Sequence, residues 1–304
     1  MKPIRVLGLF LGLSVLLLSA CGESSPPPSE SPENPPEDEA RMVVTFAHVP
    51  SVSASEKLDQ LLPLKEYLEE RLSIEFRIEF AEDYSQVVER LNHGDYDFAT
   101  LGPFSYVRAA RDGNLEVALQ PIRNGDTRYR SILFTSKQSS VKQLSDLRGK
   151  DFAFVDRSSA SGYLFPRAYM MKHGINPEQD LASYRFMGSH TDVVVGVWLG
   201  KLAAGAVYED ARTDQSNANS ILEETRVIAR TDPIPNEPWV FRKQFTAKHP
   251  QLVKEIKQLM LDLKSSGPQE KTILDRLRID GFVDASDSEY DTVRDLLQYL
   301  PQDS

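Results

Sequence analysis

"DYDFATLGPFSYVRAARDGNLEVALQP", residues 95–121, decides the fold class. Apolar runs predict strands near both ends of this segment, at 95–102 and 115–121. Residues 103–113 are predicted to form a helix, because a proline stands near their start and a glycine closes them. Strands that alternate with helices of this length indicate a parallel, doubly wound sheet.

The same alternation continues on both sides of this segment. Strands are predicted at 42–47 and 74–80, and each is followed by a helix. The first of these helices contains Pro63, which is able to interrupt it. A second α/β unit begins near Lys137, and the chain from Pro250 onward is predicted to be mainly helical. The sequence therefore predicts an α/β protein with two lobes, and a ligand cleft is expected between them at the carboxyl ends of the strands.

The N-terminus has the features of a secretory signal. Lys2 and Arg5 precede an apolar run at 6–18, which is too short to span a membrane but fits a signal peptide. The "LSAC" that follows resembles the lipobox of bacterial lipoproteins, in which the cysteine, here Cys21, carries the lipid. An ordinary signal peptide with an incidental cysteine is the alternative. We favour the lipobox because Cys21 is the only cysteine of the chain.

The predicted organisation has four parts. Residues 1–20 are the signal peptide, and residues 21–41 hold the lipidated cysteine and a disordered tether that is rich in proline and glutamate. The first lobe comprises 42–135 plus 236–304, and the second lobe comprises 136–235. We expect a monomer that is extracytoplasmic and held to a membrane by its lipid.

The charge of the chain excludes one class of partner. Its formal net charge is −10 at pH 7, and removal of the first 20 residues, with two basic side chains, gives 33 basic minus 45 acidic residues, or −12. Nucleic-acid binding requires a basic face, and the sequence shows none. An anionic ligand would therefore have to be bound by local donors against the overall field. Without cysteine in the folded part, neither disulfides nor a thiolate metal site are expected, and no cofactor is predicted.

A small, hydroxyl-rich turn is the most informative local motif. In "FVDRSSASGYLFP", residues 154–166, a buried strand runs into the small residues 158–162 and then into a helix. Free backbone amides and the positive end of the helix dipole gather at such a turn. Ser159 and Ser161 add neutral donors, so the turn suits a tetrahedral oxyanion. Plain N-capping by serine is the alternative, but capping needs one hydroxyl and this turn has three.

Other polar and aromatic residues stand beyond predicted strands. His190 precedes a helix in "MGSHTD", Asp210 ends the strand "AVYED", and Glu237 lies in the proline-rich "IPNEPW". Tyr84 and Tyr129 lie in loops after strands. Taken singly, the aromatic residues are explained by packing, the carboxylates by solvation and the histidine by a structural role.

In their order along the chain, these features resemble the phosphonate-, phosphite- and phosphate-binding proteins of bacterial ABC importers. The resemblance covers the chain from about Met42 to its C-terminus. The motifs that carry it are "DYSQVVERL", "DFATLGPFSYV", "RYRSILF", "LSDLRGKDFAFVD", "SSASGYLFP", "GSH", "GKLAAGAVYED" and "IPNEPWVFR". The resemblance implies a two-lobed, type II-like periplasmic binding protein fold with a hinge. It also implies a receptor, not an enzyme, that delivers a phosphorus oxyanion to an ABC permease and its ATPase.

The resemblance also implies a set of ligand-binding residues. In this sequence they are Tyr84, Tyr129, Ser159, Ala160, Ser161, His190, Asp210 and Glu237. Members of the family often have threonine at the position of Ala160 and can have glutamate at that of Asp210. This chain therefore has one hydroxyl donor fewer and one shorter carboxylate arm, which leaves the identity of the ligand open.

Carboxylates beside an anion have a chemical use. Phosphate-type oxyanions have a second pKa near 6 and can carry an O–H at neutral pH. Asp210 or Glu237 can accept a hydrogen bond from that O–H, or from the ammonium of an aminoalkyl phosphonate. Sulfate has no such proton, so these carboxylates are expected to disfavour it.

Three other functions remain open from the residues alone. Ser161, His190 and Asp210 suit a secreted hydrolase, but no G-x-S-x-G, H-E-x-x-H, P-loop or dinucleotide motif is present. Tyrosine, histidine and carboxylate suit a ferric-ion site or the binding of another small anion, although the tyrosines are dispersed in the sequence. A sensor domain is the third possibility, and the sequence contains no output domain.

Overall fold

The computed structural model describes residues 41–50, 54–265 and 267–301. The predicted signal peptide, Cys21 and nearly all of the tether lie outside these residues. Within them, no helix combines the length and the apolar character that a bilayer span requires.

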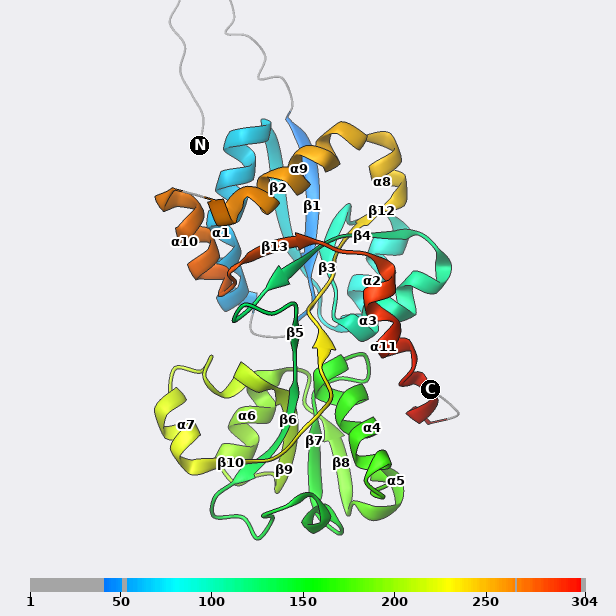
Figure 1. Cartoon of the computed structure of the whole chain (residues 1–304), viewed down its shortest axis with the longest axis vertical. Helices are drawn as coiled ribbons and strands as arrows, with labels where there is room; N and C mark the ends of the chain where they lie inside the picture. Colours follow the sequence, from blue (N-terminus) through cyan, green and yellow to red (C-terminus); the bar gives the residue numbers. More distant parts are fainter. Residues whose placement is uncertain (1–40, 51–53, 266, 302–304) are drawn as a thin grey trace, which may run out of the picture. The chain divides into compact units, whose positions relative to one another are not determined.

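The first lobe is built on a six-stranded sheet with the order β13-β4-β12-β3-β1-β2 (Figure 1). The strand bounds are β1 (Met42–His48), β2 (Ile74–Phe80), β3 (Phe98–Thr100), β4 (Leu115–Ile122), β12 (Trp239–Arg242) and β13 (Gly281–Asp284). β1 is parallel to both β2 and β3, and β2 lies at an edge of the sheet, as its alternating sequence predicts. β12 is antiparallel to β3 and β4, and β13 is antiparallel to β4.

The second lobe is built on a five-stranded sheet with the order β10-β6-β9-β7-β8. Its strands are β6 (Ser131–Ser136), β7 (Asp151–Phe154), β8 (Ser183–Phe186), β9 (Ala204–Tyr208) and β10 (Thr225–Arg230). β7 is parallel to β8 and β9, whereas β6 is antiparallel to β9 and β10. The predicted fold class, α/β with two lobes, is confirmed. The parallel pairing that the alternation predicts is present among β1, β2 and β3 and among β7, β8 and β9. The remaining pairs are antiparallel, so both sheets are mixed.

Two short strands mark where the chain crosses between the lobes. β5 (Arg128–Tyr129) lies on the way to the second lobe, β11 (Ile234–Pro235) lies on the way back, and the two pair antiparallel (Figure 1). Asn236 ties this pair to the first lobe, since its buried side chain donates to the carbonyls of Pro121 at 2.9 Å and Asp126 at 3.2 Å. The crossings therefore form one hydrogen-bonded ribbon between the two sheets.

The helices begin and end largely where sequence signals place them. Their bounds are α1 (Ala54–Leu72), α2 (Tyr84–His93), α3 (Pro103–Ala109), α4 (Phe165–Lys172), α5 (Pro177–Asp180), α6 (His190–Trp198), α7 (Ala218–Glu224), α8 (Lys243–Lys248), α9 (Pro250–Asp262), α10 (Pro268–Leu277) and α11 (Asp291–Arg294). α2 has Asp83 as its N-cap and ends at Gly94, whose φ of +94° is left-handed. α1 continues through Pro63, because its buried face, which includes Leu61 and Leu64, holds it against the sheet.

One apolar cluster lies within each lobe, and a further cluster contains buried residues of both lobes. In the first lobe the ring of Phe98 stacks on that of Phe241, with centroids 4.1 Å apart, and packs at a tilt against that of Phe46, so the contacts span three strands. The C-terminal third is not purely helical, since β13 carries the buried Phe282 into this cluster. A four-residue strand is too short to show a period of two in the sequence, which explains why it was not expected.

Candidate functional site

A cavity of about 380 Å³ lies between the two lobes. All the residues that the sequence singled out line it: Tyr84, Tyr129, Ser159, Ala160, Ser161, His190, Asp210 and Glu237. They come from both lobes and from the crossing ribbon between them. The fold therefore brings together every residue of the predicted set, while their contact with a ligand stays a prediction.

The hydroxyl-rich turn follows β7 and opens the helical segment of the second lobe. Ser159 is its N-cap, and the Ser159 hydroxyl accepts a hydrogen bond of 3.0 Å from the Gly162 amide. A single π-helical turn, Ala160–Leu164, leads into α4. N-capping and anion binding are thus compatible here, because Ser159 caps the turn and leaves Ser161 and the first backbone amides for a ligand.

Contacts from both lobes hold this turn in place. The Ser131 hydroxyl of β6 donates to the Ser161 carbonyl at 2.6 Å. The Ser105 hydroxyl of α3, in the first lobe, donates to the Ser158 carbonyl at 3.1 Å. Both bonds occupy carbonyl oxygens of the turn, so these acceptors already have partners within the protein.

The two tyrosines remain protonated at neutral pH. Tyr84 is the first residue of α2, and Tyr129 belongs to β5. Burial raises the pKa of both phenols, and the charge of Asp156 near Tyr84 raises that pKa further. Both hydroxyls are therefore donors for an anion in the cavity.

His190 is neutral as well. It is the first residue of α6, only 3% of it is exposed, and desolvation lowers its pKa to about 3. Its ring packs edge-on against Tyr208, with centroids 4.7 Å apart. Nδ1 of His190 is buried without a hydrogen bond to any residue that the structure describes. A neutral imidazole donates from one nitrogen and accepts at the other, so it can bind an oxyanion without adding charge.

The two predicted carboxylates have different surroundings. Glu237 forms an ion pair with Arg123, whose guanidinium also donates to the carbonyls of Leu277 at 3.3 Å and Arg278 at 3.0 Å. Asp210 accepts one long hydrogen bond, 3.4 Å, from Asn124. Burial, and then the charges of nearby carboxylates, raise the pKa of Asp210. Glu237 is thus neutralised by the protein, whereas Asp210 is the carboxylate that is left for a ligand.

Sequence reasoning missed the basic residues of the cavity, which are Lys57, Arg123 and Arg278. Arg278 forms an ion pair of 2.5 Å with Asp214, which in turn accepts a 2.7 Å hydrogen bond from the Tyr208 hydroxyl. Arg123 directly follows β4, and ligands in such sheets lie beyond the carboxyl ends of strands, so this rule could have predicted Arg123 as a site residue. Lys57 lies in α1 and Arg278 directly follows α10. Both stand in polar stretches, and no sequence signal tells whether a polar side chain there faces a cavity or the solvent.

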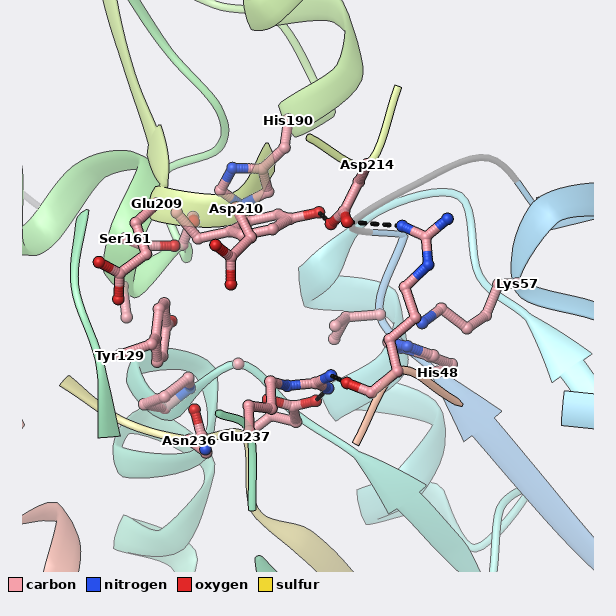
Figure 2. Close-up of a pocket in the computed structure, with 18 of the residues that line it drawn as sticks. His48, Lys57, Tyr129, Ser161, His190, Glu209, Asp210, Asp214, Asn236 and Glu237 are labelled. Carbon is pink, nitrogen blue, oxygen red and sulfur yellow. Dashed lines mark hydrogen bonds and ion pairs between the residues drawn. The ribbon is translucent and has the colours of Figure 1, made fainter. Parts of the chain in front are cut away.

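The lining is divided into two ends (Figure 2). Ser161 and Tyr129 lie at one end, which we call the serine end, and it offers neutral donors. Lys57 and His48 lie at the opposite end, which we call the lysine end, and Asp210 stands between the two. The first end suits a compact oxyanion, and the second reaches charged groups that such an anion alone would not contact.

Two further buried polar atoms of the lining have no hydrogen-bond partner in the described parts of the chain: Nδ1 of His48 and Oδ1 of Asn236. A buried polar group that stays unpaired costs about 1–3 kcal/mol, so these atoms require water or a ligand. No group of three histidine, aspartate or glutamate side chains within those parts is arranged to hold a metal ion.

Comparisons with known proteins agree with this geometry. A family model described as ABC transporter, phosphonate, periplasmic substrate-binding protein matches residues 46–290. The phosphate-import protein PhnD of Mycolicibacterium smegmatis is 30% identical over 204 residues, which are 64% of this chain and 62% of that protein. The phosphonates-binding periplasmic protein of Escherichia coli is 26% identical over 267 residues, which are 85% of this chain and 77% of that protein. The chain thus matches less than two thirds of the length of the mycobacterial protein.

Solved structures with the same fold include two binding proteins. One is a binding protein component of an ABC phosphonate transporter from Pseudomonas aeruginosa, with a TM-score of 0.77, 19% identity and coverage of 84% of this chain and 85% of that chain. The other is PhnD1 of Prochlorococcus marinus in complex with methylphosphonate, with a TM-score of 0.76, 21% identity and coverage of 84% and 97%. Since the family model spans most of the sequence, the chain belongs to the phosphonate-binding periplasmic substrate-binding proteins of ABC transporters.

Proposed function

We propose that the protein is the extracytoplasmic receptor of an ABC importer and that it binds a phosphorus oxyanion, a phosphonate, phosphite or phosphate, in the cavity. One observation carries the proposal: neutral donors from both lobes line the same cavity. They are Ser161, Tyr84, Tyr129 and His190, together with the backbone amides of the hydroxyl-rich turn, residues 158–162, which we call the serine turn. A ligand that binds these donors contacts both lobes at once, so binding favours their approach.

Asp210 supplies selectivity among anions. Its carboxylate can only accept while ionised, so it favours a ligand with an O–H or an ammonium. Sulfate would place a second acceptor against it. The neutral donors at the serine end bind any tetrahedral anion and do not discriminate.

Catalysis is not supported by the positions of the candidate residues. A hydrolase would need Ser161 within hydrogen-bonding reach of a base that a third group orients. In the described structure no hydrogen bond joins Ser161, His190 and Asp210, and Asp210 bonds Asn124 instead. We therefore propose a receptor that releases its ligand unchanged to the permease.

The anchoring of the protein is also part of the proposal. The charged start, short apolar run and sole cysteine support lipidation at Cys21, and the receptor would act as a monomer on a membrane surface. Replacement of Cys21 with Ser is expected to release the protein from membranes. Retention of that variant after an alkaline wash would contradict the lipid anchor.

Calorimetric titration with phosphate, phosphite, methylphosphonate, 2-aminoethylphosphonate and sulfate tests the binding function. We expect at least one phosphorus ligand to bind, and sulfate to bind at least about 100-fold more weakly, which corresponds to about 2.7 kcal/mol. Equal affinity for sulfate and every phosphorus ligand, or no binding of any of them, would overturn the proposal.

A further inference from the structure

The cavity is larger than a simple oxyanion requires. Its volume of about 380 Å³ lies in the range of roughly 300–1,000 Å³ that is usual for sites of small organic molecules. A phosphate or methylphosphonate at the serine end would leave the lysine end, beyond Asp210, without a ligand atom (Figure 2). The ligand is therefore expected to carry an organic arm that reaches that end.

Lys57 is the cation of the lining that lacks a partner. The other two are paired, Arg123 with Glu237 and Arg278 with Asp214. The Lys57 ammonium forms no hydrogen bond or ion pair with any described residue, although it extends toward the cavity from α1 (Figure 2). Desolvation, and then the charge of Arg123, lower the pKa of Lys57 to about 8. The charges of Glu237, Glu56 and Asp214 oppose this shift without cancelling it, and an anionic group in contact with Lys57 would reduce the remaining cost of burying its charge.

Asp210 stands between the lysine end and the serine end of the lining, whereas Glu209 lies beside Ser161 at the serine end (Figure 2). Asp210 forms no ion pair within the described parts of the chain, and neither does its neighbour Glu209, which accepts a 2.9 Å hydrogen bond from the Arg130 amide. A carboxylate that forms no ion pair, as Asp210 does in the described structure, suits an ammonium. From one end to the other, the cavity thus presents neutral donors, then the carboxylate of Asp210, and then the ammonium of Lys57, and neither of these two charged groups forms an ion pair with a described residue.

We propose that the lysine end binds the carboxylate of the ligand's organic arm, so that the ligand is a phosphonate with an amino acid arm: phosphonate at the serine end, ammonium at Asp210 and carboxylate at Lys57. This inference rests on the proposed function, because it assumes a phosphonate at the serine end. It adds a charged group that methylphosphonate and 2-aminoethylphosphonate do not have. Both of those ligands would leave Lys57 unpaired.

The test compares ligands that differ by one group. Affinities of the full-length protein are measured by calorimetry for 2-amino-3-phosphonopropionate, 2-aminoethylphosphonate and methylphosphonate at pH 7. The first two share the amine and the phosphonate and differ by the carboxylate. We expect the carboxylate to tighten binding at least tenfold, which corresponds to about 1.4 kcal/mol.

Variants then assign the effect to Lys57. Lys57→Gln is expected to reduce the affinity ratio of 2-amino-3-phosphonopropionate to 2-aminoethylphosphonate at least tenfold. Lys57→Arg keeps the positive charge and should retain most of the wild-type ratio. Lys65→Gln is the matched control, because Lys65 lies on the same helix, pairs with Glu69 and is outside the cavity lining. This control should leave the ratio unchanged.

The possible results separate the inference from the function on which it rests. If 2-aminoethylphosphonate or methylphosphonate binds but the carboxylate of 2-amino-3-phosphonopropionate adds no affinity, the inference fails and the proposed function stands. An unchanged affinity ratio in Lys57→Gln also overturns the inference. If Lys57→Gln does not fold, the wild-type ratio still decides. If no phosphorus ligand binds, both the proposed function and the inference fail.

Discussion

Asp210 and Glu237 are chemically similar but are placed in different electrostatic surroundings. Glu237 is neutralised by Arg123, so its charge serves to position that arginine on the crossing ribbon. Asp210 forms no ion pair with a described residue, and burial and then the neighbouring carboxylates raise its pKa, against a smaller opposing effect of the Arg123 charge. A ligand that donates to Asp210 relieves this penalty, whereas an acceptor-only anion increases it.

Replacement of Asp210 with Asn is therefore expected to narrow the gap between phosphonates and sulfate. The amide supplies a donor of the same size, so sulfate gains a hydrogen bond while a ligand with an O–H or ammonium loses one. Calorimetry with 2-aminoethylphosphonate and sulfate measures both changes. Ser161→Ala is the matched comparison, and it should weaken both anions together by about 1–3 kcal/mol.

An unchanged selectivity in Asp210→Asn would show that this carboxylate does not contact the ligand. Asp284→Asn provides a surface control, because the Asp284 side chain is 71% exposed and pairs with Lys257. It should alter neither affinity.

Lys57 makes the preference for a carboxylate arm depend on pH. Its pKa of about 8 means that it is charged below pH 8 and loses its proton above it. The groups whose charges act on it are Arg123, Glu237, Glu56 and Asp214, and the first opposes the charged form. The affinity ratio of 2-amino-3-phosphonopropionate to 2-aminoethylphosphonate should therefore fall as the pH rises from 7 to 9.

Calorimetry across this range measures that ratio, in which the titration of the shared phosphonate and amine largely cancels. Lys57→Arg should keep the ratio constant to pH 9, since arginine stays protonated. A ratio that falls equally in this variant would assign the pH dependence to another group.

The serine turn shows how an element is shaped for its site. Gly162 lies where the turn passes β7, and a Cβ there would stand 2.4 Å from the Val155 side chain and 2.9 Å from the Ser159 hydroxyl. Glycine is required for this close approach, not for its backbone angles. The approach keeps the amides of the turn at the cavity and leaves the Ser159 hydroxyl free to act as the cap.

Gly162→Ala is expected to move the turn and to destabilise the fold by about 1–3 kcal/mol, as overpacking does. All tetrahedral ligands should weaken together, because the amides and hydroxyls move as a unit. Urea denaturation and calorimetry measure the two effects. Gly267→Ala is the control, since the atom nearest its Cβ belongs to the flexible end of Glu270.

The sequence predicted the elements that carry strong local signals and missed those that depend on distant contacts. The serine turn and α2 were predictable, because capping residues and glycines mark their ends. β6 and β13 were not, because a short buried strand has no distinctive period. The Arg123–Glu237 pair joins residues 114 positions apart, and Lys57 stands in a polar stretch whose composition suits solvent equally well.

At the scale of the whole molecule, the described chain passes between the lobes at the crossings that pair as β5 and β11. The C-terminal segment, residues 285–301, also contacts both lobes. Arg167 of α4, which is 4% exposed, donates to the Tyr299 carbonyl at 2.6 Å and pairs with Glu178. The C-terminal segment thus follows β13 in the first lobe and packs on a helix of the second. Any opening of the cavity has to move or carry it.

Ligand binding is expected to bring the lobes closer through rotation about the crossing ribbon. Small-angle scattering with saturating 2-aminoethylphosphonate should show a smaller radius of gyration than with sulfate at the same concentration. An unchanged radius, with binding established by calorimetry on the same sample, would contradict the hinge.

The neutral donors of the serine end bear on how salt affects the receptor. Dissolved ions weaken attractions between exposed charges, but they have little effect on hydrogen bonds from buried hydroxyls and amides. In the proposed site, methylphosphonate would accept hydrogen bonds from Ser161, Tyr84, Tyr129 and His190, so its dissociation rate should stay nearly the same from low to high ionic strength. Its association should become faster, because salt screens the repulsion between an anion and a chain of net charge −10. The affinity of the receptor for methylphosphonate is therefore expected to increase with ionic strength.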